Sequence, residues 1–430
     1  MNYLIRGARV VGPRAVTESD LLIEDGRIAK IGLVRASKGA EVIDAKGLLA
    51  LPGFIDLHVH GGMGFDLTGG MYDAKRGRFD SSEAAYSRGF PTVAKHFARH
   101  GVTRALLATS AAPMDRLENA LEYLADYMAG PANGRQGARL EGAFLEGTYI
   151  LKPERAGAQD PAHFFAPDAK LFDRLNRRGT IRYVNVVPEF GRRTEVFLRH
   201  LARRGVLAGA GHCECPADQA LRCEKLGLRT AVHFLNGAVG TSFKPFHGGN
   251  MVEAVLRSPT MIAELICDGW HINSAYVLDV IARKGLDRIA LVTDAVLVAG
   301  LRGAREFQMG SKTGAVDPTG QYVQLKGTRD TLAGSLLTMD RAFSNALSWL
   351  TADSVGIWQT KHRAMPLDRA LTGLARACAA TPAQLLGLDR QTGSLTAGRR
   401  ADVVLASLAG RAGRWDLQVR RTFVDGCPVT

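Results

Sequence analysis

Histidine and carboxylate side chains recur in this sequence at the ends of short apolar runs. Imidazole nitrogen and carboxylate oxygen are ligand atoms that suit zinc and iron. One histidine at a strand end is more commonly a structural hydrogen bonder, but six such positions together favour a metal site. They are His58, His60, Glu146, His212, His233 and Asp294, and a further histidine, His271, follows another run.

The spacing of His58 and His60 is itself informative. Alternate residues of a β-strand point to the same face, so two imidazoles two residues apart can bind one ion. The segment just before them, Pro52–Asp56, would lead the chain from its N-terminal part into the element that carries this pair.

Eight apolar runs alternate with helical patterns between residues 53 and 294. In the segments Ser82–His100 and Met114–Met128 the apolar residues follow a helical period, with Leu117, Leu121 and Leu124 on one face of the second. The eight runs are Gly53–His58, Thr103–Ser110, Leu140–Glu146, Arg182–Glu189, Val206–His212, Thr230–Asn236, Ile262–Asp268 and Ile289–Asp294.

Eight strand–helix units over roughly 240 residues match the size of a (β/α)₈ TIM barrel, with a doubly wound open sheet as the alternative. A barrel brings the C-terminal ends of its strands together, and its active site lies there. The candidate ligands all fall at such ends, which favours the barrel. Histidines inside the helical patterns, His96, His100 and His200, are excluded by position and are expected to be exposed or locally satisfied.

Both ends of the chain are rich in short strand patterns. Tyr3–Gly7 and Leu21–Ile28 lie at the start, with Asp25-Gly26 as a hairpin-turn signal, and Ala401–Leu405 and Val419–Val424 lie at the end. We expect these segments to pair in one small β-sandwich domain. The predicted organisation is residues 1–52 and 395–430 for that domain and 53–394 for the barrel.

Composition restricts the partners. The formal net charge is +13, but the lysines and arginines are scattered, so we predict no nucleic-acid partner, while an anionic small molecule remains compatible. Six irregularly spaced cysteines suggest a reducing compartment. The N-terminus lacks a signal-peptide pattern, and apolar runs are too short to span a membrane, so a cytoplasmic location without membrane association is predicted.

The ordered set of motifs resembles the amidohydrolase superfamily and, within it, the N-acetylglucosamine-6-phosphate deacetylases. The similarity spans nearly the whole chain. The matching segments are Leu51–Gly62, Leu145–Gly147, Gly211-His212, Val232–Gly237, Asp268–His271, Leu291–Ala295 and Leu332–Ser335.

This resemblance implies a metal centre of one or two divalent ions, zinc first and iron(II) second. Glu146, His212 and His233 would hold the principal ion, and His58, His60 and Asp294 would offer a second position. Glu141 is a rival for Glu146, because both stand in a Leu-Glu-Gly tripeptide. Glu146 is preferred because Arg155–Ala158 follows it at nearly the family's interval.

The resemblance also implies roles in amide hydrolysis. A metal lowers the pKa of its bound water toward about 7. Asp294 would accept that water's proton and pass it to the leaving amine, and His271 would stabilise the tetrahedral oxyanion. Asn236 and Gly237 would bind the far end of the substrate.

Three features depart from the family pattern on the substrate side. Gln159 stands where the family commonly has a histidine, and it is carried over as a substrate-binding residue. Lys244, in the stretch 241–249, replaces the arginine that holds the sugar phosphate and lacks its bidentate fork. Residues 67–80, with three basic side chains, are interpreted equally well as a rebuilt anion site or as a solvated loop.

The prediction is therefore a metal-dependent hydrolase that deacetylates an N-acetyl amino sugar 6-phosphate. An alternative is the same chemistry on an unphosphorylated N-acetyl amino sugar or an N-acyl amino acid. A third is a barrel that has lost catalysis and only binds. The resemblance further predicts a homodimer.

Overall fold

The eight apolar runs form a parallel barrel in the computed structural model, which describes residues 1–237, 246, 248–359 and 361–430. Each strand pairs with the next one along the chain, in one continuous order. This confirms the (β/α)₈ barrel over the open sheet. The strands are β6 (Phe54–Val59), β11 (Val102–Ala108), β12 (Arg139–Tyr149), β13 (Ile181–Val186), β14 (Leu207–Ala210), β15 (Leu228–Ala231), β16 (Ile262–Ile266) and β17 (Ile289–Val292).

The first and last strands of the barrel meet at a seam. The backbone N–H of Asp294 donates to the carbonyl of His58 at 2.8 Å. Below this contact the Thr293 hydroxyl donates to the carboxylate of buried Asp56 at 2.6 Å. The seam therefore fixes two candidate site residues, His58 and Asp294, relative to one another.

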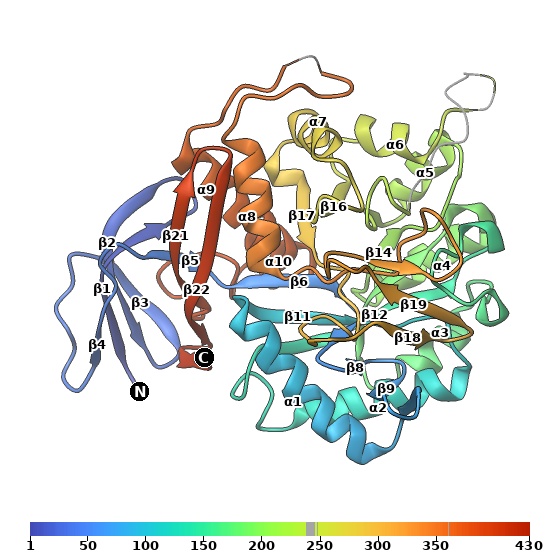
Figure 1. The fold of residues 1–430 in the computed structure, drawn as a ribbon, viewed down its shortest axis with the longest axis horizontal. Coiled ribbons are helices and arrows are strands. Elements are labelled where there is room, and N and C mark those ends of the chain that lie inside the picture. Colours follow the sequence, from blue (N-terminus) through green and yellow to red (C-terminus); the bar gives the residue numbers. More distant parts are fainter. Residues whose placement is uncertain (238–245, 247, 360) are drawn as a thin grey trace.

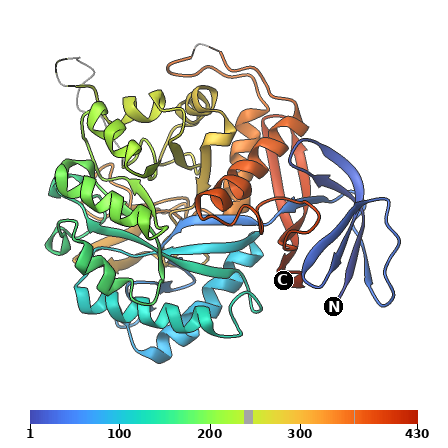
Figure 2. The same cartoon turned by 180° about the vertical axis from the view of Figure 1, so that it is seen from behind.

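A helix follows each barrel strand, and the helices lie on the outside of the strands (Figure 2). The predicted segments Ser82–His100 and Met114–Met128 are confirmed, and Ser82 caps the first helix through the Ala85 N–H. The helices are α1 (Glu83–Arg99), α2 (Met114–Ala129), α3 (Ala169–Leu175), α4 (Arg192–Arg203), α5 (Ala217–Lys225), α6 (Met251–Arg257), α7 (Ser274–Lys284) and α8 (Met339–Leu350), followed by α9 (Leu367–Ala375) and α10 (Thr381–Leu385).

The two ends of the chain meet in one sheet beside the barrel, where both termini lie (Figure 1). β5 pairs antiparallel with β21 and so joins the N-terminal strands to the C-terminal ones. The strands are β1 (Tyr3–Val11), β2 (Val16–Glu24), β3 (Arg27–Gly32), β4 (Glu41–Asp44), β5 (Leu49–Pro52), β21 (Val403–Arg411), β22 (Arg414–Val424) and β23 (Cys427–Pro428). The predicted turn Asp25-Gly26 connects β2 to β3 with φ values of 48° and 75°.

Buried ion pairs link this sheet to the N-terminal end of the barrel strands. Arg104 on β11 is 3% exposed and contacts Asp402 at 2.7 Å, Asp425 at 2.6 Å and also Glu141. Glu141 is the extra residue of a bulge, since Ala105 pairs with Leu140 and the next residue pairs with Gly142. Glu141 is therefore a structural residue at the end of the barrel next to the small sheet.

Two insertions pack together above the barrel. The first contains β7 (Gly61–Gly62), β8 (Phe65–Asp66), β9 (Gly70–Asp73) and β10 (Arg78–Asp80), and the second contains β18 (Glu306–Met309), β19 (Lys312–Val316) and β20 (Val323–Leu325). We call the second insertion the arm. Tyr72 and Phe79 from the first insertion join the apolar cluster around Phe307 of the arm. Residues 67–80 thus form a hairpin whose base packs against the arm and whose tip, residues 74–78, is exposed.

The remaining features are simple. Among the described residues, no helix is long and apolar enough to cross a membrane. All six cysteines are free thiols. The helical histidines divide: His100 and His200 contact Asp340 and Asp173, but His96 is buried, contrary to the expectation that it be exposed or locally satisfied.

Candidate active site

The candidate ligands stand at the C-terminal end of the barrel, but four of them lie beyond their strands, and His60 directly follows β6. β14, β15 and β17 end at Ala210, Ala231 and Val292, and His212, His233 and Asp294 each follow two residues later. The prediction that the sixth strand contains His233 is therefore wrong. These three residues have φ values of 57°, 32° and 51°. Such left-handed backbone costs energy for residues other than glycine, and it ends the ladder while turning the side chain toward the barrel axis.

Glu146, His212 and His233 form one cluster. Oε1 of Glu146 lies 3.1 Å from Nε2 of His233 and 3.4 Å from Nε2 of His212. The two imidazole nitrogens are 3.2 Å apart. Of the two rival glutamates, Glu146 reaches these histidines, whereas Glu141 contacts Arg104.

His58, His60 and Asp294 form a second cluster that touches the first. Nε2 of each histidine lies 3.4 Å from Oδ1 of Asp294. Glu146 also faces this cluster, with Oε2 3.1 Å from Nε2 of His60 and Oε1 3.5 Å from Nε2 of His58. One carboxylate therefore borders both groups, and all six predicted ligands lie together.

The donor atoms fit divalent cations. His212 donates its Nδ1–H to the Arg155 carbonyl at 2.7 Å, which leaves a lone pair on Nε2 facing the cluster. Nε2 of His58 is buried and has no hydrogen-bond partner among the described residues. With neutral histidines, the two carboxylates carry two negative charges, which one divalent cation would balance. Each cluster offers three converging ligand atoms within 4.8 Å of one another.

The carboxylates of the site are held ionised. With no metal bound, burial raises the pKa of Asp294, but the positive charges of protonated His58 and His60 outweigh it and lower that pKa to about 2. Burial likewise opposes ionisation of Glu146, yet His58, His212 and His233 hold its pKa well below the usual range. Both groups are thus anionic at neutral pH, as cation ligands must be.

Several residues around the clusters were not predicted from the sequence. Glu264, fully buried on β16, places Oε2 3.4 Å from Nδ1 of His58 and accepts a hydrogen bond from Tyr183 at 2.6 Å. A glutamate inside an otherwise apolar strand is the signal that could have revealed it. Gln159, which was carried over as a substrate-binding residue, lines the cavity and donates to Oε2 of Glu146 at 2.9 Å.

A cavity of about 1090 Å³ opens above the clusters. His271 lines it, and its Nδ1 bonds the Asp268 carboxylate at 2.7 Å. Burial raises the pKa of Asp268, but the hydrogen bond and charge of His271 lower it overall. His271 is therefore oriented by a charged partner while its ring borders the cavity.

The predicted substrate-binding residues are only partly described. Asn236 and Gly237 line the cavity, in the turn that follows His233. A Cβ atom at Gly237 would lie 2.0 Å from Cε1 of His233, so only glycine fits there. Lys244 lies outside the described residues. The basic side chains of the 67–80 segment, Lys75, Arg76 and Arg78, are exposed and lie outside the cavity lining.

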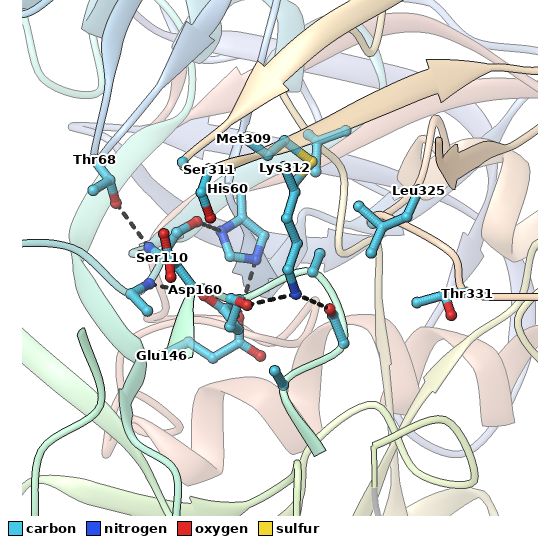
Figure 3. A pocket seen from close by; sticks show the side chains of 18 of the residues that line it. His60, Thr68, Ser110, Glu146, Asp160, Met309, Ser311, Lys312, Leu325 and Thr331 are labelled. Atoms are coloured by element: carbon cyan, nitrogen blue, oxygen red, sulfur yellow. Dashed lines mark hydrogen bonds and ion pairs between the residues drawn. The ribbon is translucent and has the colours of Figure 1, made fainter. Parts of the chain in front are cut away.

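The arm supplies one wall of the cavity, which the sequence did not indicate. Met309, Ser311, Lys312 and Leu325 of the arm line the cavity together with His60, Ser110 and Glu146 (Figure 3). The wall combines apolar side chains with two ammonium groups, those of Lys312 and Lys326. It can enclose a small polar molecule from the side opposite the barrel.

Comparisons with known proteins agree with this geometry, although no family model matches the chain. The chain is 27% identical to an N-acetylglucosamine-6-phosphate deacetylase of Bacillus subtilis (strain 168), over 94% of this chain and 93% of the relative. It is 29% identical to an N-acetylgalactosamine-6-phosphate deacetylase of Escherichia coli O157:H7, over 94% and 95%.

A solved structure has the same fold. It is a variant of N-acetyl-D-glucosamine-6-phosphate deacetylase from Mycobacterium smegmatis, in complex with N-acetyl-D-glucosamine-6-phosphate. The TM-score is 0.81 at 23% identity, and the alignment covers 100% of this chain and 99% of that one. The chain therefore shares the fold of this deacetylase and is similar over nearly its whole length to N-acetylglucosamine-6-phosphate deacetylases.

Proposed function

We propose that this protein is a metal-dependent hydrolase that removes the acetyl group from an N-acetylhexosamine 6-phosphate. The observation that carries the proposal is that Glu146 contacts four histidines of two adjoining clusters that line one cavity. The relatives named for this activity support the substrate class.

Glu146, His212 and His233 would hold the principal metal ion, and His58, His60 and Asp294 would hold a second. Nitrogen and oxygen donors suit zinc, and iron(II) fits the same set. When bound, such a metal acts as a Lewis acid and supplies a water that ionises near neutral pH.

Asp294 would act as general base and then as general acid. Its carboxylate is ionised at neutral pH and lines the cavity, so it can accept a proton on a carboxylate oxygen. It would then deliver that proton to the nitrogen of the departing amine. Positioned proton transfer of this kind contributes about 10²–10⁴-fold.

His271 would stabilise the developing oxyanion. Asp268 accepts its Nδ1–H at 2.7 Å and fixes the ring against rotation. With both nitrogens protonated, Nε2–H can donate to the oxygen of the scissile amide. A donor placed for this charge in advance lowers the barrier without reorganisation.

The test is acetate release by the zinc-loaded protein. The substrates are N-acetylglucosamine 6-phosphate, N-acetylgalactosamine 6-phosphate, unphosphorylated N-acetylglucosamine and an N-acetyl amino acid. The proposal requires a strong preference for a phosphorylated sugar and an inactive Asp294→Asn variant that still folds. Cleavage of only the unphosphorylated compounds would reject the substrate class, and metal binding without any cleavage would reject catalysis on all four.

A further inference from the structure

Two of the proposed metal ligands are oriented by one loop rather than by the barrel. The loop comprises residues 153–163 and contains two short helical turns, Pro153–Arg155 and Pro161–His163. Its Arg155 carbonyl accepts Nδ1–H of His212 at 2.7 Å. Its Gln159 amide donates to Oε2 of Glu146 at 2.9 Å and accepts the Ala111 N–H at 2.8 Å. The loop therefore sets the direction of a carboxylate and of an imidazole.

The arm holds this loop from the other side. Nζ of Lys312 donates to the carbonyls of Gly157 at 2.7 Å and Gln159 at 2.8 Å. The neighbouring Ser311 hydrogen-bonds the Asp160 carboxylate. Figure 3 shows Lys312 reaching down from β19 to the loop. Gln159 thus spans the two contacts, with its backbone bound to Lys312 and its side chain bound to Glu146.

A lysine suits this task because its ammonium group offers three donors from one point. The backbone carbonyls of Gly157 and Gln159, two residues apart in the chain, converge on it. Among the described residues, no carboxylate lies within ion-pair distance of Lys312. Two other basic residues of the cavity wall are paired with acids, Arg155 with Glu214 and Lys326 with Glu306 on the arm itself. The charge of Lys312 is thus directed at the loop.

We propose that Lys312 is a positioning residue that sets the geometry of the Glu146, His212 and His233 ligand set through this loop. The inference deepens the proposed function and rests on its metal site. The second cluster is held differently, since its His58 and Asp294 meet at the β6–β17 seam. Loss of Lys312 is therefore expected to act on the first metal position.

The test is a zinc titration of the full-length protein after removal of metal with a chelator. Lys312→Met should weaken zinc binding at the Glu146, His212 and His233 position by about 10-fold. This is the lower end of the range for residues that hydrogen-bond metal ligands. Lys312→Arg, which still offers several donors, should restore most of the affinity. Lys326→Met is the matched control, because it removes a lysine from the same arm and cavity wall, and it should bind zinc as the unaltered protein does.

The thermal midpoint of the metal-free protein separates positioning from plain stabilisation. The inference requires a change in zinc affinity with little change in that midpoint. Unchanged zinc affinity would overturn it. If, in that case, the KM for a phosphorylated sugar alone rises, Lys312 is an anion-binding residue instead. Zinc titration needs no substrate, so failure of the deacetylase assignment would appear separately, as zinc binding without acetate release.

Discussion

Oε2 of Glu264 lies 3.4 Å from Nδ1 of His58 in the interior of the barrel. The same carboxylate accepts a hydrogen bond from the Tyr183 hydroxyl at 2.6 Å, and Tyr183 stacks on Phe144 beneath the site. A carboxylate behind a histidine favours the tautomer with the proton on Nδ1 and so leaves Nε2 as a ligand atom. Glu264 thus favours the tautomer of His58 that leaves Nε2 free to bind metal, and the Arg155 carbonyl does the same for His212.

We expect Glu264→Gln to weaken metal binding at the His58, His60 and Asp294 cluster by about 10–100-fold. The amide removes the charge that favours Nδ1–H on His58 while keeping the side-chain volume. Metal content per protein, measured by atomic emission after dialysis, should fall toward one ion if both positions are filled beforehand. Tyr183→Phe is the control, because it leaves the Glu264 carboxylate in place. A full metal complement in Glu264→Gln would contradict the role.

The two glutamates of β12 allow a matched comparison. Glu146→Gln should lose metal and lower activity by more than about 100-fold, because it removes the carboxylate that borders both clusters. Glu141→Gln should keep metal and activity but lower the free energy of unfolding by about 1–3 kcal/mol, since it weakens a buried contact to Arg104. Metal analysis, acetate release and denaturant unfolding distinguish the two. Equal loss of metal in both variants would argue against the assignment.

The fold followed from the sequence because period and spacing are local properties. All eight predicted runs became barrel strands, and the turn Asp25-Gly26 connects two strands as expected. The ends of the last strands were less accurate, because His212, His233 and Asp294 have left-handed backbone that no apolar pattern records. The arm was missed altogether, since its strands are short and lie between β17 and α8, outside the regular alternation.

The convergence of the six candidate ligands also followed from the sequence, because ligand types are few and strand ends converge. What surrounds the ligands did not. Gln159 was predicted as a substrate-binding residue, yet both ends of its amide bond protein groups, Glu146 and Ala111. Lys312 is 153 residues from the carbonyl of Gln159 that it binds. Such contacts depend on tertiary packing and leave no periodic signal.

His96 predicts a specific sensitivity to acid. Burial, with a smaller contribution from the nearby His100, lowers its pKa from 6.5 to about 4. Between these values the unfolded chain binds more protons than the folded one, so stability falls as the pH falls from 6.5 to 4. The contribution lost is on the order of 3 kcal/mol. Urea unfolding of metal-free protein at pH 7 and pH 4.5 measures it.

His96→Gln removes this titration, so the drop in unfolding free energy between the two pH values should shrink. His100→Gln is the control, because that histidine is partly exposed and bonds the Asp340 carboxylate at 2.9 Å. An unchanged pH dependence in His96→Gln would show that other groups cause the acid sensitivity.

The pair His271 and Asp268 separates transition-state stabilisation from metal binding, because neither residue belongs to the two ligand clusters. His271→Asn should lower kcat by about 10²–10³-fold, as loss of one oxyanion donor does, with metal content unchanged. Asp268→Asn should have a smaller effect, since it keeps a hydrogen-bond partner for Nδ1 but removes the charge beside the ring. Steady-state kinetics at saturating zinc would give kcat and KM for each variant. A fall in metal content, or an increase confined to KM, would mean that His271 serves the metal or the substrate's ground state and not the oxyanion.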